Sequence, residues 1–292
     1  MLESAAIVFN PASGAGDPDA DLTLIREIFA GEGVDLTVYP PQEARQAVDS
    51  GSRLVLAAGG DGTVSAVADL LIGSGQALGV VPRGTANAFA LGLGIPLGLE
   101  AACTTALRGA ERVIDAARCN GRPMTLLAGI GFEAETVEKT DREAKESWGP
   151  LAYFLAGARQ LGEQELFEVT LDMESYSHTL PASAVTVANV APATSFLAQG
   201  CGEVVPDDGL LDVTVGIADT RIEAVLTFLD LMWSALQKKA VERENVIHFR
   251  TNRVRISATP PQKLVIDGEL SGLTPVEVEV VPGGLLVMVP RA

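Results

Sequence analysis

Three glycines bracket a single carboxylate directly after the apolar, strand-like run of residues 54–58. The turn consists of Gly59, Gly60, Asp61, Gly62 and Thr63. A helix beginning near Thr63 would point its first amides and its positive dipole end at this turn, which suits a phosphate chain. Glycines are expected there because the backbone needs positive φ and a Cβ would keep phosphates away. A carboxylate beside a polyphosphate indicates a bridging divalent cation, so the turn predicts a Mg²⁺-nucleotide site.

The same turn also fits a tight strand-to-helix connection in any α/β protein. No Gly-Lys-Ser/Thr sequence follows it, and no G-x-G-x-x-G pattern with a distant acidic residue is present. The usual P-loop and dinucleotide fingerprints are therefore excluded.

Two more polar turns follow strand-like runs, one after residues 5–9 and one after residues 77–81. At the ends of neighbouring parallel strands they would face the same nucleotide as Asp61. The candidate nucleotide-binding residues are Asn10, Pro11, Ser13, Gly14, Gly59, Gly60, Asp61, Gly62, Thr63, Gly84, Thr85 and Asn87.

Two acidic turns lie in the second half of the chain. Residues 203–212 crowd four carboxylates into one turn, where oxygen ligands suit Mg²⁺ or Ca²⁺. A solvated Asp-Gly turn is the favoured interpretation of this segment. In the other turn, an apolar strand delivers Asp267 and Glu269, a placement that suits a general base with a second carboxylate beside it. A plain hairpin turn explains that pattern equally simply.

The elements that must position these residues divide into two groups. At 292 residues the chain suits two domains, each able to bury its own core. Strands alternating with helices predict an α/β N-terminal domain, residues 1–117, with a doubly wound, mostly parallel sheet. Successive strands predict a C-terminal antiparallel β-sandwich domain, residues 118–292.

In the second domain, Asn120-Gly121 is a strong hairpin signal. Helices are expected at 150–161 and 222–240. Strands are expected at 166–173, 182–190, 210–217, 254–258, 263–266, 276–280 and 285–289.

The formal net charge of −17 argues against nucleic acid as a partner and against broad adhesion to anionic membranes. The three cysteines, Cys103, Cys119 and Cys201, are far apart and form no zinc motif, which favours free thiols in a cytoplasmic protein. The first residues lack a basic segment, so no signal peptide is expected. The longest uncharged stretch contains prolines and polar residues, so no membrane span is expected.

Five motifs together carry a resemblance to a known family. They are Asn10-Pro-Ala-Ser-Gly14, Gly59-Gly-Asp-Gly-Thr63, Pro82-Arg-Gly-Thr-Ala-Asn87, Pro206-Asp-Asp-Gly-Leu-Leu-Asp212 and Asp267-Gly-Glu269. Their order and spacing resemble those of the bacterial diacylglycerol kinase-like lipid kinases, over nearly the whole chain. The central turn by itself is shared with sphingosine kinases, NAD kinases and 6-phosphofructokinases.

The resemblance implies that ATP lies in a cleft between the domains, held by the three N-terminal turns. Asp267 would accept the proton of a lipid hydroxyl that attacks the γ-phosphate, while Asp61 and Mg²⁺ offset charge, and Glu269 completes the catalytic set. A structural Mg²⁺ would be held by Glu203, the carbonyl of Pro206 and Asp208. The implied location is cytoplasmic and peripheral to the inner face of the membrane. The expected partners are a lipid alcohol and a transient membrane surface, with a homodimer left open.

Two departures from the family pattern keep other functions open. Ser65-Ala66 stands where an Asn-Glu pair is usual, and Ala88 stands where many members have Asp. Both changes remove acidic groups beside the nucleotide. The alternatives are a non-catalytic regulator that binds nucleotide or Mg²⁺ and, less favoured, a soluble-substrate kinase of the NAD kinase type.

Overall fold

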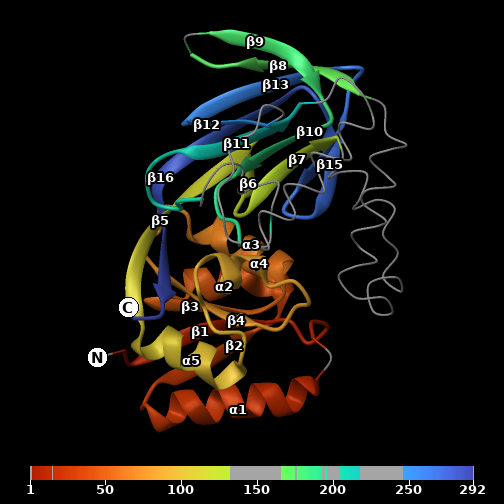
Figure 1. The fold of residues 1–292 in the computed structure, drawn as a ribbon. Coiled ribbons are helices and arrows are strands. Elements are labelled where there is room, and N and C mark those ends of the chain that lie inside the picture. Colours follow the sequence, from red (N-terminus) through yellow and green to blue (C-terminus); the bar gives the residue numbers. More distant parts are fainter. Residues whose placement is uncertain are drawn as a thin grey trace. The chain divides into compact units, whose positions relative to one another are not determined.

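The computed structural model describes residues 2–14, 16–131, 166–174, 176–192, 195, 204–217 and 246–291. These residues form two compact units (Figure 1). The first contains residues 1–116, 206–208 and 281–292, and the second contains residues 117–205 and 209–280. The first break lies one residue before the predicted boundary of 117/118. The prediction placed 206–208 and 281–292 in the second domain, whereas their contacts lie with the first.

The first unit is built on a parallel sheet. Its strands are β1 (Ser4–Phe9), β2 (Asp35–Tyr39), β3 (Leu54–Gly59) and β4 (Ala77–Pro82), together with the last residues of β16 (Val276–Val289). The strand order is β2-β1-β3-β4-β16, and every pair in this series is parallel. Because β3 and β4 are buried along their whole length, both faces of the sheet must be covered.

Helices cover the two faces of this sheet (Figure 1). The helices are α1 (Pro18–Gly31), α2 (Ala44–Asp49), α3 (Asp61–Leu71), α4 (Ala88–Gly92) and α5 (Leu99–Arg108), with a short 3₁₀ helix at Pro41–Glu43. Ile25 and Phe29 of α1 share one core with Cys103 and Ala106 of α5, against alternate residues of β1 and β3. Helices α2 and α3 lie on the opposite face, so the sheet is doubly wound, as predicted.

The second unit consists of two antiparallel sheets. One pairs β9 (Ser177–Ala182), β8 (Phe167–Asp172), β13 (Arg253–Thr259) and the first part of β16. The other has the order β12 (Val246–Thr251), β11 (Leu211–Gly216), β10 (Ala184–Ala188), β7 (Leu127–Gly131), β14 (Lys263–Ile266) and β15 (Glu269–Leu273). Apolar residues from both sheets form one core, which confirms the predicted β-sandwich.

Strand β5 (Ala110–Cys119) pairs with β6 (Arg122–Met124) through the predicted Asn120-Gly121 hairpin. Both turn residues have positive φ, as a type I′ turn requires. The strands predicted at 276–280 and 285–289 are one continuous strand, β16, which does not break at Pro282. Its first part pairs with β13 and its last part with β4, and between them the amide of Gly283 donates to Asp115 over 2.8 Å.

The helices predicted at 150–161 and 222–240 lie outside the described residues, as do Glu203 and Cys201. Within the part of the chain that is described, no helix is long and apolar enough to cross a membrane.

Candidate active site

The three predicted turns of the first unit meet at one edge of the parallel sheet. They follow β1, β3 and β4, whose carboxyl ends share this edge. The strand order changes direction between β1 and β3, because β2 lies beyond β1 and β4 lies beyond β3. In open α/β sheets, such a switch point forms the crevice where ligands bind.

A hydrogen bond joins the first two turns. The side-chain amide of Asn10 donates to the hydroxyl of Thr63 over 3.1 Å. Asn10 also accepts from the backbone amide of Ala12 through its side-chain oxygen, which shapes the turn after β1. Sequence alone predicted that both turns face one ligand, and the structure shows that their side chains contact each other.

Close backbone packing requires glycine in the second and third turns, and Gly60 and Gly84 bring these two turns into contact. A Cβ on Gly84 would lie only 2.5 Å from the Cα of Gly60, and a Cβ on Gly59 would lie 2.4 Å from the hydroxyl oxygen of Thr63. The sequence predicted that positive φ requires glycine at 59, 60 and 62. That prediction is wrong, because none of these three glycines has positive φ. Close packing against neighbouring atoms explains Gly59 and Gly60 instead.

Asp61 begins α3 and reaches the start of α4, directly after the third turn. One carboxylate oxygen, Oδ1, accepts from the backbone amide of Phe89 over 3.1 Å. The carboxylate therefore has a structural function that the sequence did not suggest. No other hydrogen bond to this side chain is found among the described residues, which leaves its second oxygen able to face a cation.

Asn87 closes the third turn upon itself. Its side-chain oxygen accepts from the amide of Gly84, and its side-chain nitrogen donates to the carbonyl of Gly84, both over 2.8 Å. The residue is buried and adopts a left-handed backbone, with φ of 47°. Asn87 therefore shapes the turn, whereas the neighbouring Thr85 is exposed.

Arg83 is the residue at this edge that sequence reasoning missed. Its side chain is buried, with Nε 3.0 Å from Asp21 Oδ2 and Nη1 donating to the carbonyl of Asn10 over 2.6 Å. The guanidinium also stacks 4.5 Å from the centre of the Phe9 ring. An arginine directly after a buried strand is the signal that could have found it. Arg83 connects the first and third turns to α1, and its charge is paired with that of Asp21.

The predicted base, Asp267, lies in the second unit at the hairpin between β14 and β15. Asp267 and Gly268 both have positive φ, and Ile266 pairs with Glu269, so the turn is a two-residue type I′ hairpin. The half-buried carboxylate of Asp267 accepts bonds from the Thr125–Leu127 segment, which precedes and enters β7. Glu269 is exposed at the start of β15.

Of the predicted structural metal ligands, the structure describes Pro206 and Asp208. The carbonyl of Pro206 accepts from the amide of Asp115 over 2.7 Å, and the neighbouring Asp207 pairs with Arg112 at 2.8 Å. Among the residues described, no group of three or more His, Cys, Asp or Glu side chains is placed to hold a metal ion. The segment is part of the first unit.

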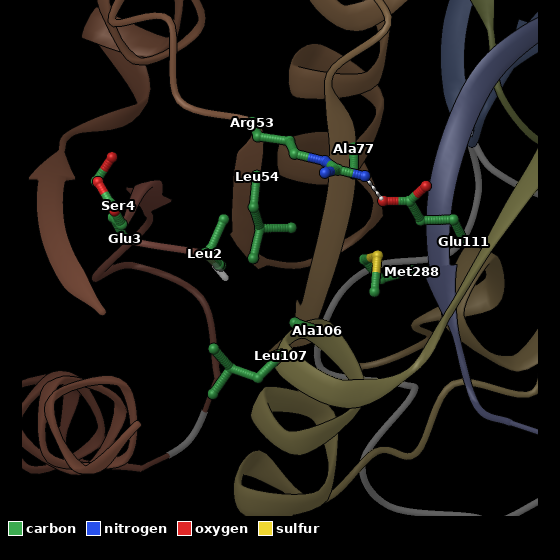
Figure 2. Close-up of a pocket in the computed structure, with 10 residues that line it drawn as sticks. All are labelled: Leu2, Glu3, Ser4, Arg53, Leu54, Ala77, Ala106, Leu107, Glu111 and Met288. Atoms are coloured by element: carbon green, nitrogen blue, oxygen red, sulfur yellow. Dashed lines mark hydrogen bonds and ion pairs between the residues drawn. The ribbon is translucent and has the colours of Figure 1, made fainter. Parts of the chain in front are cut away.

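A hollow in the first unit lies at the other end of the sheet, away from the three turns. A cavity of about 430 Å³ is found where β1, β3 and β4 begin, with Leu54, Ala77 and Met288 in its wall (Figure 2). An ion pair between Arg53 and Glu111 lies at this cavity, with 2.7 Å between nitrogen and oxygen. None of the predicted site residues lines it.

The chain is similar to known kinases along most of its length. Residues 4–119 match the diacylglycerol kinase catalytic domain, and residues 127–289 match the YegS C-terminal NAD kinase beta sandwich-like domain. A probable YegS-like lipid kinase of Stenotrophomonas maltophilia is 30% identical, over 90% of this chain and 89% of that protein. A diacylglycerol kinase of Bacillus subtilis is 27% identical, over 94% of this chain and 93% of that protein.

The fold has solved counterparts. The crystal structure of a diacylglycerol kinase from Bacillus anthracis strain Sterne superposes with a TM-score of 0.76 at 22% identity, over 98% of this chain and 97% of the other. This likeness confirms the predicted fold of an α/β unit followed by a β-sandwich.

Proposed function

Because the chain belongs to the diacylglycerol kinase-like lipid kinase family and is a kinase, we propose that it transfers the γ-phosphate of ATP to the hydroxyl group of a lipid alcohol. The observation that carries this proposal is the contact among three turns at the switch point of the parallel sheet. Asn10 bonds to Thr63, and Gly60 packs against Gly84, so the three turns form one surface. Such a surface supports the binding of a nucleotide's phosphates.

The start of α3 supplies the attraction for phosphate. Helix α3 has 11 residues and begins at Asp61; the amide of Thr63 bonds to the carbonyl of Gly60 over 2.9 Å, and the amides before it have no partner within the helix. Backbone amides and the helix dipole favour negative charge at this end. We infer that the phosphates of ATP lie against residues 60–63, with Asn10, Ser13, Gly14 and Thr85 from the flanking turns.

Asp61 is the proposed protein ligand of the Mg²⁺ that accompanies ATP. Its Oδ1 is fixed by the amide of Phe89, and its position at a helix start beside glycines fits an oxygen ligand of a hard cation. Bound Mg²⁺ would neutralise charge on the transferring phosphate. Since Ser65, Ala66 and Ala88 offer no further carboxylate, ATP itself is proposed to supply the remaining negatively charged oxygens.

Asp267 is the proposed acceptor of the proton from the lipid hydroxyl, with Glu269 as the second carboxylate of this turn. Asp267 is fixed by a hairpin and is half-buried, which suits a base whose position must be defined. Asp208 and the carbonyl of Pro206 remain the proposed ligands of a structural Mg²⁺. We also propose a cytoplasmic location with transient contact at the membrane surface, because a lipid substrate resides in the membrane.

The test is transfer of labelled γ-phosphate from Mg-ATP to a panel of lipid alcohols in mixed micelles. Diacylglycerol, sphingosine and phosphatidylglycerol represent the candidate acceptors, and NAD and sugar phosphates serve as soluble controls. A labelled lipid supports the proposal and identifies the acceptor. Label in NAD or a sugar, with none in lipid, contradicts it, and ATP binding without any transfer favours a regulator.

A further inference from the structure

The side chain of Arg83 is buried although it carries a charge. It is 3% exposed and follows directly after β4, at the start of the third turn. A buried charge is costly unless it is paired and hydrogen-bonded. Nε donates to Asp21 Oδ2 over 3.0 Å, Nη2 lies 3.0 Å from the same oxygen, and Nη1 donates to the carbonyl of Asn10 over 2.6 Å. The guanidinium therefore holds α1 and the turn after β1 at the same time.

The backbone of Arg83 contacts the other turns of the sheet edge. Its amide donates to the carbonyl of Gly59 over 2.8 Å, at the turn after β3. A Cβ on Gly14 would lie 2.8 Å from the carbonyl oxygen of Arg83, so the turn after β1 packs directly against this backbone. Arg83 lies in the third turn and contacts both of the others.

The two acceptors of the guanidinium lie on either side of the proposed phosphate-binding residues Ser13 and Gly14. Asn10 precedes them, and Asp21 follows them in the first turn of α1. The carbonyl of Asn10 also accepts from the amide of Ser13 over 3.3 Å, so Arg83 bonds to the same carbonyl that closes this turn. One buried side chain thus fixes the chain before and after this part of the proposed site.

We propose that Arg83 is a positioning residue that sets the affinity of the site for ATP without touching the nucleotide. The inference rests on the proposed function and adds to it the residue on which the geometry of the site depends. Donors from separate turns can bind one phosphate chain only if each lies within about 3 Å of a phosphate oxygen. Arg83 keeps the turn after β1 in place relative to the other two turns, and so keeps these distances short.

A buried ion pair that only stabilised the fold would behave differently. Its loss would lower the free energy of unfolding, but the molecules that remained folded would bind ATP as tightly as wild type. Loss of a positioning residue instead raises the dissociation constant of ATP for the folded protein. Because the same turns hold the phosphates in the ground state and in the transition state, transfer at saturating ATP changes little.

Arg83→Met is the informative variant, since methionine keeps an apolar stem beside the Phe9 ring and removes the side-chain donors. The side chain of Asp21 is 32% exposed, so water solvates its carboxylate when the arginine is absent. Arg53→Met is the matched control. It removes an exposed ion pair with Glu111 directly before β3, at the opposite end of the sheet.

Calorimetry under conditions where each protein is folded should show that Arg83→Met raises the dissociation constant of ATP by about tenfold, whereas Arg53→Met leaves it unchanged. Asp21→Asn is a second variant that keeps the shape of the carboxylate, and it should also weaken ATP binding. Single-turnover transfer at saturating ATP should stay within about threefold of wild type in Arg83→Met. Wild-type ATP affinity in Arg83→Met and Asp21→Asn would overturn the inference, and so would a loss of about 10²-fold in transfer at saturating ATP.

Hydrogen exchange of the nucleotide-free protein is a test that does not depend on lipid phosphorylation. The amide of Asn10 bonds to the carbonyl of Ala58 over 2.9 Å, and that of Ser13 bonds to the carbonyl of Asn10. Both amides should exchange faster in Arg83→Met than in Arg53→Met, and equal exchange would overturn the inference even if wild type phosphorylates a lipid. Wild type that binds ATP but labels no lipid would contradict the proposed function alone, whereas wild type that binds no ATP would overturn both.

Discussion

The side-chain amide of Asn10 lies 3.1 Å from the hydroxyl of Thr63 and joins the turns after β1 and β3. These residues are 53 positions apart, yet adjacent parallel strands bring them to the same sheet edge. The bond fixes the two turns at the switch point, where a ligand is expected. The geometry of the proposed nucleotide site therefore depends on a contact between its own side chains.

Replacing Asn10 by alanine should weaken ATP binding. Loss of one hydrogen bond of this kind costs about 1 kcal/mol, so the dissociation constant measured by titration calorimetry should rise about fivefold to tenfold. Thr23→Ala is the control, because it removes an exposed hydroxyl from α1, away from the turns. Equal ATP affinity in wild type and Asn10→Ala would contradict the assignment of this turn.

Replacing Gly84 by alanine should destabilise the first unit. The new Cβ would lie 2.5 Å from the Cα of Gly60 and 3.0 Å from Asn87 Oδ1, so the backbone must shift. We expect a loss of about 1–3 kcal/mol in urea unfolding. Gly31→Ala is the comparison, because nothing lies within 4 Å of that Cβ at the end of α1. If Gly84→Ala and Gly31→Ala unfold at the same urea concentration, the turns after β3 and β4 do not approach each other as closely as described.

Strands β1, β3 and β4 were predictable because each is almost entirely buried and is followed by a glycine-bearing turn. Strands β9, β12 and β15 were not predicted. Each lies at an edge of its sheet, and β9 and β15 are largely exposed, so they lack the apolar alternation that identifies a strand. The two ends of β16 pair with β13 and β4, which are distant in the sequence, so its continuity through Pro282 has no local signal.

The candidate site divides in the same way. The glycine turns carry a local signal, so their positions at the sheet edge could be read from the sequence. The partners of Asp61, Arg83 and Asp267 could not, since each bond joins residues far apart in the chain. Long-range bonds of this kind appear only once strand order and register are known.

Replacing Asp212 by alanine should destabilise the second unit strongly. Asp212 is 2% exposed, and its Oδ1 accepts from His248 Nε2 over 2.8 Å and from Arg250 Nε over 3.0 Å. Removing one member of a buried ion pair costs about 3 kcal/mol or more, and Arg250 is partly exposed, so we expect the lower end. Denaturant unfolding measures this change.

Glu277→Ala is the matched control for Asp212. Glu277 pairs with Arg253 at 2.7 Å on the surface, with both side chains well exposed. Such pairs contribute about 0–1 kcal/mol. If Asp212→Ala lowers the free energy of unfolding by no more than Glu277→Ala does, the buried cluster around Asp212 contributes little to stability.

The two described cysteines should make unfolding easier at high pH. Burial raises the pKa of the Cys103 thiol from 9.0 to about 12, and burial together with the charge of Asp267 raises that of Cys119 to about 11. Both thiols stay neutral in the folded protein as pH rises above 9, while thiolates form in the unfolded chain. Their contribution to stability is therefore complete below pH 9 and is lost as pH rises toward 11 and 12.

Each thiol adds a slope of about 1.4 kcal/mol per pH unit in this range. Urea unfolding of wild type and Cys103→Ala between pH 8 and pH 10.5 measures it. The stability of wild type should fall more steeply than that of Cys103→Ala. Identical slopes would mean that the Cys103 thiol ionises equally well in the folded protein.

The most direct test of lipid phosphorylation compares wild type with Asp267→Asn in one assay. Label is followed from the γ-phosphate of Mg-ATP into lipid alcohols, and ATP binding is measured on the same samples. We predict a labelled lipid with wild type, and a loss of about 10²-fold or more with Asp267→Asn at unchanged ATP affinity. Equal lipid labelling by both proteins would contradict the function of Asp267, and no labelled lipid with wild type would contradict lipid kinase activity itself.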